Sequence, residues 1–354
     1  LPALPGAVKM VSAPPCRAPQ QLPLRSPGRR EDGFRPALPG TAKIMKAIAL
    51  DEYGDAGVLQ LRELPDPPVG PDSVRVRVHA AGVNPVDAGI RAGGLQQAYP
   101  HHTPLIPGWD VAGVVDAVGP AVTRFQPGDE VMAYARKETI QHGTYAELVT
   151  VAEPAVAHKP AALTFPEAGG LPLAGLTAYQ ALTALGVGPG DTVLVHAAAG
   201  GVGHLAVQIA RALGASRVIG TASPTNHDFL RGLGCIPLPY GDDLPSLVAA
   251  EAGGDGRVDA ALDLVGGSAL TQSPTLVRNP ARHASIVDPA VKDQGGHYVF
   301  VRPDGPMLET VGALATAGRL RVEIARELPL SEAAEAHRLI EARHVRGKIV
   351  LTLP

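Results

Sequence analysis

The sequence predicts an α/β fold, in which a β-rich domain is followed by a doubly wound domain with a parallel sheet. Two observations carry this prediction. From residue 45 to about 165, short strand-like runs are broken by Gly and Pro, a spacing typical of a compact β domain. From residue 166 onward, short continuous apolar runs alternate with segments of helical period, as expected for parallel strands that helices cover on both faces.

Composition limits the possible partners. The 354 residues exceed the usual size of one domain, so two domains are expected. The formal net charge of −3 offers no positive field, and no stretch has the length and apolarity of a membrane span, so neither nucleic acid nor membrane is an expected partner. Two cysteines are too few for a disulfide framework, so we expect a cytoplasmic location.

Residues 1–44 differ from the rest of the chain. They are rich in proline and arginine, lack helical or strand periodicity, and contain no apolar segment of the kind found in secretory signals. We interpret them as an upstream extension or an artificial leader, with a genuine tail as the alternative. Patterned sequence begins at Met45.

The β-rich domain contains three runs with clear strand character, which are SVRVRVHAAGV from Ser73, DVAGVVDAVG at 110–119 and PGDEVMAY at 127–134. Between the first two, His101 and His102 stand next to each other in a proline-rich segment. We expect that segment to be a surface loop.

The doubly wound domain begins with a strand and a helix. Residues 191–197, DTVLVHA, form a continuous apolar run expected of a buried parallel strand. Apolar residues then recur at helical spacing from Val202 to Leu213, and Gly214 stands where a helix stop belongs. Further strand-like runs occupy 216–221, 258–265, 283–287 and 297–301.

The turn between that first strand and helix, HAAAGGVG, aligns with the dinucleotide-binding pattern G-x-G-x-x-G. Ala198 takes the first glycine position, Gly200 the second and Gly203 the third. The second glycine lets backbone N–H groups approach a pyrophosphate, and the third lets the helix pack closely on its strand. Because the turn lies between a strand and a helix, we predict cofactor contacts at Ala199, Gly200, Gly201, Val202 and Gly203, rather than a glycine-rich turn that binds nothing.

The end of the second strand indicates which dinucleotide is bound. NAD sites usually carry a carboxylate about 20 residues after the glycines, which binds the ribose 2′-hydroxyl. Here TASPTNHD supplies no acid before Asp228, and its candidate cofactor contacts are Thr221, Ser223, Asn226 and His227. Hydroxyl and amide donors suit a 2′-phosphate, so we predict NADP(H). Only His227 or Arg231 adds positive charge in this stretch.

Several stretches together resemble a known family. They are AAGVNPVDAGIR, PLIPGWDVAGVVDAVG, PGDEVMAY, LAGLTAYQAL, HAAAGGVG, DLVGG and RGKIVL, and they occur in this order over residues 45–354. The chain resembles the medium-chain dehydrogenase/reductase superfamily, in its zinc-free quinone oxidoreductase (zeta-crystallin-like) branch. The resemblance implies a GroES-like catalytic domain at 45–165, a Rossmann NADP-binding domain at 166–305 and a segment at 306–354 that returns to the catalytic domain. It also implies a homodimer and an active site between the domains.

The residues at the zinc positions of this superfamily argue against a metal. Zinc-dependent relatives place a cysteine where this chain has Asn84, a histidine at Trp109 and a third ligand at about Leu173. An amide, an indole and an alkyl chain cannot ligate zinc. Without a Lewis acid, alcohol oxidation is difficult. The expected reaction is therefore zinc-independent hydride transfer from NADPH to a quinone or an α,β-unsaturated carbonyl.

Two residues are candidates for catalysis. Asn84 can donate through its side-chain amide beside the nicotinamide, with a turn Asn before Pro85 as the alternative. Tyr99 is a candidate proton donor to the product enolate. Relatives carry a tyrosine at the position of Gly89 or near Leu95, and both are absent here, so solvent is the alternative donor.

The carboxylate of Asp87 is expected to bind nearby backbone or Arg91 rather than to act in catalysis. Cys235 is expected to be a small buried residue. The resemblance also implies further cofactor contacts, which are Thr177, Tyr240, Val265, Phe300, Val301 and Lys348, the last at the phosphates. Ordinary core packing, a loop aromatic and a solvated charge are the alternatives for these residues.

Two other functions stay open. The stretch TASPTNHDFLRGLG resembles polyketide-synthase enoylreductase domains, although Asn226 replaces their usual lysine. The chain could therefore be an enoyl-thioester reductase of a biosynthetic pathway. The absence of the expected tyrosine leaves room for a non-catalytic NADPH-binding protein.

Overall fold

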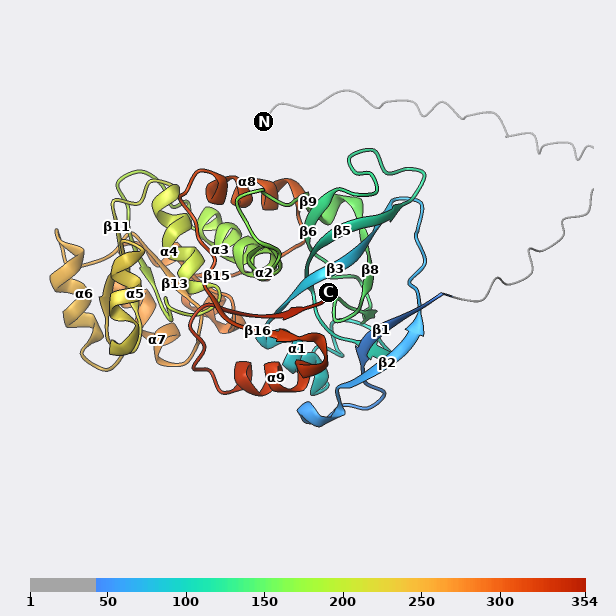
Figure 1. The fold of residues 1–354 in the computed structure, drawn as a ribbon. Helices are drawn as coiled ribbons and strands as arrows, with labels where there is room; N and C mark the ends of the chain where they lie inside the picture. Colours follow the sequence, from blue (N-terminus) through green and yellow to red (C-terminus); the bar gives the residue numbers. More distant parts are fainter. Residues whose placement is uncertain (1–42) are drawn as a thin grey trace, which may run out of the picture. The chain divides into compact units, whose positions relative to one another are not determined.

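The computed structural model describes residues 43–354, and the predicted extension lies outside the described residues except for its last two positions. The described residues belong to one compact unit that contains two large and two small sheets. Figure 1 shows the helices of residues 203–276 gathered around the sheet of residues 192–298, whereas the helix of residues 333–341 lies beside the other large sheet. Within residues 43–354, no helix reaches the length and apolarity that a membrane crossing requires.

The first large sheet combines the β-rich part of the chain with its final strands, in the order β16-β17-β3-β5-β6-β9, and β8 also pairs with β3. Its strands are β3 (Ser73–Val83), β5 (Asp110–Val118), β6 (Glu130–Tyr134), β8 (Leu148–Ala152), β9 (Val156–His158), β16 (Ile324–Pro329) and β17 (Lys348–Thr352). The first half of β3 pairs with β8 and its last residues pair with β17. The long strand β3 therefore brings the end of the chain beside the β-rich part. The three predicted strands correspond to β3, β5 and β6.

Two small sheets flank this one. Strands β1 (Ile44–Ala49) and β2 (Gln60–Pro65) are antiparallel, and β4 (His101–Ile106) pairs in parallel with β7 (Ile140–His142). The prediction of a loop at His101 and His102 is wrong, because both begin β4. Strand β4 pairs with β7, which comes much later in the chain, and the local sequence around β4 does not indicate that contact.

The second large sheet has six parallel strands in the order β12-β11-β10-β13-β14-β15. They are β10 (Thr192–Val195), β11 (Arg217–Thr221), β12 (Ile236–Leu238), β13 (Ala260–Asp263), β14 (His283–Ser285) and β15 (His297–Tyr298). By order of appearance this is 3-2-1-4-5-6, the arrangement of doubly wound dinucleotide-binding domains. Five of the six strands were predicted. The last is shorter than expected, because only residues 297–298 of the run 297–301 pair with a neighbour.

Helices cover both faces of this sheet. In β10, Val193 and Val195 pack in one apolar cluster with Leu205 of α4, whereas Leu194 packs in another with Val248 of α6. The helices of residues 43–354, of which α1, α2 and α9 pack at the first large sheet instead, are α1 (Pro85–Arg91), α2 (Phe165–Gly170), α3 (Pro172–Ala184), α4 (Gly203–Ala212), α5 (His227–Gly232), α6 (Leu244–Ala252), α7 (Ser268–Leu276), α8 (Gly305–Thr316) and α9 (Ala333–Glu341). The α/β fold with its doubly wound parallel sheet is thus confirmed.

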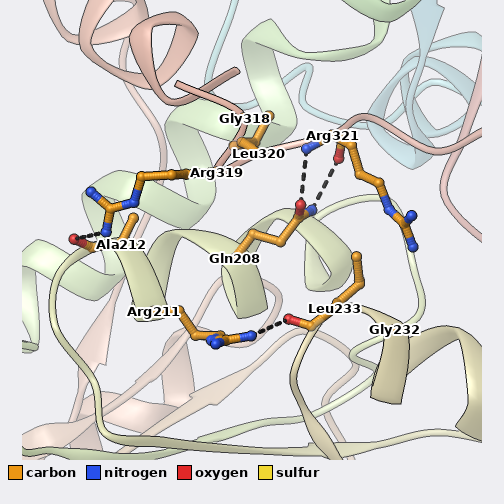
Figure 2. Close-up of a pocket in the computed structure, with 9 residues that line it drawn as sticks. All are labelled: Gln208, Arg211, Ala212, Gly232, Leu233, Gly318, Arg319, Leu320 and Arg321. Carbon is orange, nitrogen blue, oxygen red and sulfur yellow. Dashed lines mark hydrogen bonds between the residues drawn. The ribbon is translucent and has the colours of Figure 1, made fainter. Parts of the chain in front are cut away.

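Arginine side chains donate hydrogen bonds to backbone carbonyls at the C-terminal ends of α4 and α5 (Figure 2). Arg211 donates to the carbonyl of Leu233 at the end of α5, and Arg319 donates to the carbonyl of Ala212 at the end of α4, both at 3.0 Å. These arginines and Gln208 line a cavity of about 450 Å³. Carbonyls at helix C-termini lack partners within the helix, and basic side chains commonly satisfy them. The basic character of this cavity therefore has a structural cause.

Candidate active site

The packing around the glycine-rich turn explains how alanine can take the place of its first glycine. The buried Cβ of Ala198 would lie 2.6 Å from a Cβ at residue 220, which is glycine in this chain. Gly220 therefore makes room for the alanine. A Cβ at Gly203 would lie 2.3 Å from the carbonyl oxygen of Ala197, so α4 can begin here only with glycine.

Two cavities lie next to this turn. The first, here called the outer cavity, has a volume of about 540 Å³ and is lined by residues that include Thr221, Ser223, Asn226, Tyr240, Val265 and Arg343. The second, the inner cavity, has about 320 Å³ and is lined by residues that include Asn84, Trp109, Tyr134, Thr177, Val301 and Lys348. Ala197 and Gly200 line both cavities. They follow β10, beside the point where strand order reverses, which is where ligands bind in open α/β sheets.

Nearly all predicted contact residues line one of these cavities. The outer cavity contains Ala199, Gly200, Thr221, Ser223, Asn226, Tyr240 and Val265. The inner cavity contains Asn84, Thr177, Gly200, Gly201, Val202, Gly203, Phe300, Val301 and Lys348. Large apolar side chains are exposed beside the cavities, with Tyr240 at 68%, Val265 at 51% and Phe300 at 44% exposure. Exposed apolar surface of this kind fits a site that a ligand covers.

Two predicted residues line neither cavity. The ring of Tyr99 packs edge-to-face against Trp109 at 6.4 Å. The His227 ring approaches the carbonyl oxygen of Ala222 at 3.2 Å. The proposed roles of these two residues, in proton donation and cofactor binding, stay predictions.

The outer cavity contains a cation that sequence reasoning missed. Arg343, His344 and Val345 follow α9 and line this cavity together with Ser223. Arg343 forms no ion pair within residues 43–354, whereas Arg231 pairs with Asp228 at 2.6 Å on the surface. The basic residues immediately before RGKIVL were a usable signal, because the resemblance had already placed that motif at the cofactor.

Asn84 and Lys348 belong to a buried polar network in the wall of the inner cavity. Asn84 is the N-cap residue of α1, and its Nδ2 donates to Asp110 Oδ2 at 2.9 Å. The ammonium of Lys348 donates to Asn84 Oδ1 and to the carbonyl of Val83, and it lies 3.8 Å from Asp110 Oδ2. Because lysine can only donate and a carboxylate can only accept, these partners fix the orientation of the amide.

Burial shapes the ionisation of this network. Asp110 and Lys348 are almost inaccessible to solvent, so burial raises the pKa of Asp110 and lowers that of Lys348, and their mutual attraction opposes both shifts. The backbone N–H of Leu173 also donates to Asp110, at 2.7 Å. The predicted contact of Lys348 with cofactor phosphates stays a prediction.

Asp87 has the expected structural role. Its Oδ2 accepts from the backbone N–H of Asn84 at 2.8 Å and from the Tyr145 hydroxyl at 3.1 Å. Arg91 instead pairs with Glu341 at 2.6 Å. Complete burial raises the pKa of Asp87 to about 7.

The three positions that carry zinc ligands in zinc-dependent relatives come together here. Asn84, Trp109 and Leu173 all line the inner cavity. Their amide, indole and alkyl groups do not provide the thiolate, imidazole or carboxylate ligands that zinc needs. Elsewhere in residues 43–354, no group of three or more His, Cys, Asp or Glu side chains is arranged to hold a metal ion.

The strand order, the glycine-rich turn and the adjoining cavities define a dinucleotide-binding protein with a second, β-rich domain. Residues 70–161 match the family described as alcohol dehydrogenase GroES-like domain, and residues 241–351 match the one described as zinc-binding dehydrogenase.

Individual relatives indicate the branch of the family to which the chain belongs. The chain is 33% identical to the chloroplastic NADPH-dependent alkenal/one oxidoreductase of Arabidopsis thaliana, covering 87% of this chain and 80% of that protein. It is 34% identical to the 2-methylene-furan-3-one reductase of Solanum lycopersicum, covering 87% and 79%. The solved quinone oxidoreductase of Coxiella burnetii superposes with a TM-score of 0.78 at 35% identity, covering 88% of this chain and all of that one. The chain belongs to the medium-chain dehydrogenase/reductase superfamily, in its quinone oxidoreductase branch, a family of NAD(P)-dependent oxidoreductases.

Proposed function

We propose that this protein is an NADPH-dependent reductase of quinones or α,β-unsaturated carbonyl compounds. The observation that carries the proposal is the inner cavity, where the glycine-rich turn meets an apolar pocket that contains the buried Asn84–Lys348–Asp110 network. The names of the Arabidopsis and Solanum relatives support the same substrate class.

The cavities suit the two halves of the cofactor. The inner cavity would hold the nicotinamide half against Thr177, Phe300 and Val301, and the outer cavity would hold the adenosine half near Tyr240 and Val265. When bound, NADPH supplies a hydride. The geometry of the turn fits this group, since Gly203 brings α4 close to its strand and leaves the helix N-terminus for the pyrophosphate.

The outer cavity favours a 2′-phosphate over a free 2′-hydroxyl. Ser223 and Asn226 offer donors, and no carboxylate lines this cavity to hold a ribose diol. Arg343 adds a positive charge with no carboxylate partner in the described part of the chain. A guanidinium and hydroxyl donors together match a phosphate dianion.

Asn84 and its neighbours would orient the acceptor. One N–H of the Asn84 amide is committed to Asp110, which leaves the second for a carbonyl oxygen in the cavity. The Lys348 contact holds the amide in one orientation, so this donor is in place before the substrate arrives. A fixed donor stabilises the charge that develops on oxygen when a hydride adds to a conjugated acceptor.

Turnover assays on the full chain test the proposal. We expect oxidation of NADPH in preference to NADH with phenanthrenequinone or an alkyl enone, and much slower turnover of crotonyl thioester. Preference for the thioester would instead support an enoyl-thioester reductase. Binding of NADPH without turnover of any acceptor would support a non-catalytic protein. The homodimer and the cytoplasmic location stay predictions, and sedimentation tests the first.

A further inference from the structure

Tyr134 lies in the wall of the inner cavity, where sequence analysis assigned no function. It is the last residue of β6 and is paired in register with Asp110 of β5. Side chains directly opposite each other on paired strands lie on the same face of the sheet. Because the Asp110 side chain reaches Asn84, Tyr134 stands beside the same network, and it lines the cavity with Asn84 and Lys348.

The hydroxyl of Tyr134 has no partner. The residue is 0% exposed, and its oxygen is one of the few buried side-chain polar atoms without a hydrogen bond in residues 43–354. None of the other residues that carry such atoms lines the inner cavity. Buried hydroxyls almost always find a partner, and leaving one unsatisfied is costly. An unpartnered hydroxyl on a residue that lines the inner cavity therefore fits a partner that a bound substrate supplies.

The neighbours of Tyr134 hold its ring in place, and one of them is a cation. The indole of Trp109 packs edge-to-face at 5.9 Å between ring centroids. The guanidinium of Arg136 lies 5.7 Å from the ring centroid and donates to the carbonyl of Val301 at 3.0 Å. Burial raises the pKa of the Tyr134 hydroxyl well above its ordinary value, so the group keeps its proton in the free protein, and the nearby guanidinium opposes that shift.

We infer that the Tyr134 hydroxyl is the proton donor that completes reduction of an enone, an inference that rests on the proposed function. Addition of the hydride to the β-carbon breaks the C=C π bond and leaves an enolate. The enolate electron pair then forms a bond from the α-carbon to the Tyr134 proton, and the O–H bond breaks to give a phenolate beside Arg136. Water returns the proton to the phenolate, so the net reaction consumes NADPH, the enone and one proton.

The sequence offered two other candidates for the proton donor, which are Tyr99 and solvent. Tyr99 lines neither cavity, and its ring centroid lies 5.8 Å from the same guanidinium. Solvent, the second candidate, adds a proton without facial preference once the enolate leaves the site. A donor fixed in the cavity wall delivers it to one face of the α-carbon, and this difference can be measured.

The test compares Tyr134→Phe with the wild type in D₂O, using NADPH and an α-methyl enone that gains a stereocentre at its α-carbon. We expect the wild type to form one enantiomer in excess. Tyr134→Phe should lower kcat at least about tenfold, leave KM within a few fold, and give a racemic product, since general acids typically contribute 10²–10⁴-fold. Tyr179→Phe is the matched control, because Tyr179 lines neither cavity.

A quinone separates this inference from the proposed function. Hydroquinone oxygens take protons readily from water, so Tyr134→Phe should reduce phenanthrenequinone at a rate within about threefold of the wild type. Unchanged enone kcat and unchanged enantiomeric excess in Tyr134→Phe would overturn the inference while the function stands. Loss of both in Tyr99→Phe instead would also overturn it. If the wild type reduces neither acceptor, the proposed function fails and the inference with it.

Discussion

The ammonium of Lys348 in the last strand donates a hydrogen bond to the side-chain oxygen of Asn84, 264 residues earlier in the chain. The same ammonium lies 3.8 Å from Asp110 Oδ2, and all three side chains are buried. The pairing of β17 with β3 makes this contact possible. The three residues of this network are therefore far apart in the sequence, and they come together because the end of the chain returns to the first large sheet.

Replacing Lys348 with methionine should strongly destabilise the protein. The substitution leaves Asp110 buried without its counter-charge, and removing one partner of a buried pair typically costs about 3–5 kcal/mol. The free energy of unfolding, measured in urea, checks this. Lys292→Met, at an exposed position, is the control. Adding Asp110→Asn should recover at least about 1 kcal/mol, and strictly additive losses would show that the two groups do not interact.

The ionisation of Asp87 predicts a pH-dependent stability. Its pKa is about 7 in the folded protein, against an ordinary value of 3.8, so between these values the folded state holds a proton that the unfolded state has lost. Stability from this group is therefore full at low pH and is lost as pH rises toward 7. Relative to Asp87→Asn, the wild-type free energy of unfolding should fall by roughly 2–3 kcal/mol between pH 5 and pH 7.

Only the slope of that difference tests the prediction, because the amide also introduces a buried donor at every pH. Asp242→Asn, at an exposed position, controls for loss of a carboxylate. Parallel stability curves for wild type and Asp87→Asn would show that Asp87 is already ionised in the folded protein.

Local pattern was enough to predict the elements around the turn. The run at 191–197 and the helix behind it gave β10 and α4 because burial on both faces and helical period are properties of neighbouring residues. Strand β12 went unpredicted, because it has only three residues and one of them is Pro237, so it forms no recognisable strand-like run.

The candidate site was predictable where it follows from the turn and unpredictable where tertiary contacts build it. The contacts predicted at 199–203 and 221–227 came from one motif and the end of the next strand, which a parallel sheet gathers at one edge, whereas contacts such as Thr177 and Lys348 came from the family resemblance. Arg343 reaches the outer cavity only because the segment after α9 returns there. Tyr134 looked like the end of an ordinary strand, and only its cross-strand pairing with Asp110 reveals its place beside the network.

Arg343 should decide the preference for NADPH. Arg343→Ala should raise KM for NADPH by about 10–100-fold and leave KM for NADH within a few fold, because a charge-assisted contact with a 2′-phosphate contributes about 1.5–3 kcal/mol. Steady-state kinetics with both cofactors check this, with Arg257→Ala at an exposed position as control. Equal losses with both cofactors would mean that Arg343 supports the fold of the loop instead. A selective loss in Arg231→Ala would return the role to the second-strand turn.

The unpartnered hydroxyl of Tyr134 predicts that removing it stabilises the protein. Tyr134→Phe keeps the ring and deletes a buried polar group without a partner, so the free energy of unfolding should rise by about 1 kcal/mol. Tyr145 is equally buried, but its hydroxyl donates to Asp87 at 3.1 Å. Tyr145→Phe should therefore lose about 1–3 kcal/mol.

The two tyrosines make a matched pair, since one substitution at two fully buried positions should change stability in opposite directions. Urea unfolding of both variants decides it. If Tyr134→Phe is destabilised as much as Tyr145→Phe, an ordered water already satisfies the hydroxyl, and the substrate is not needed to explain it. If Tyr134→Phe is more stable but slower with the enone, the free protein carries an unsatisfied donor that only catalysis explains.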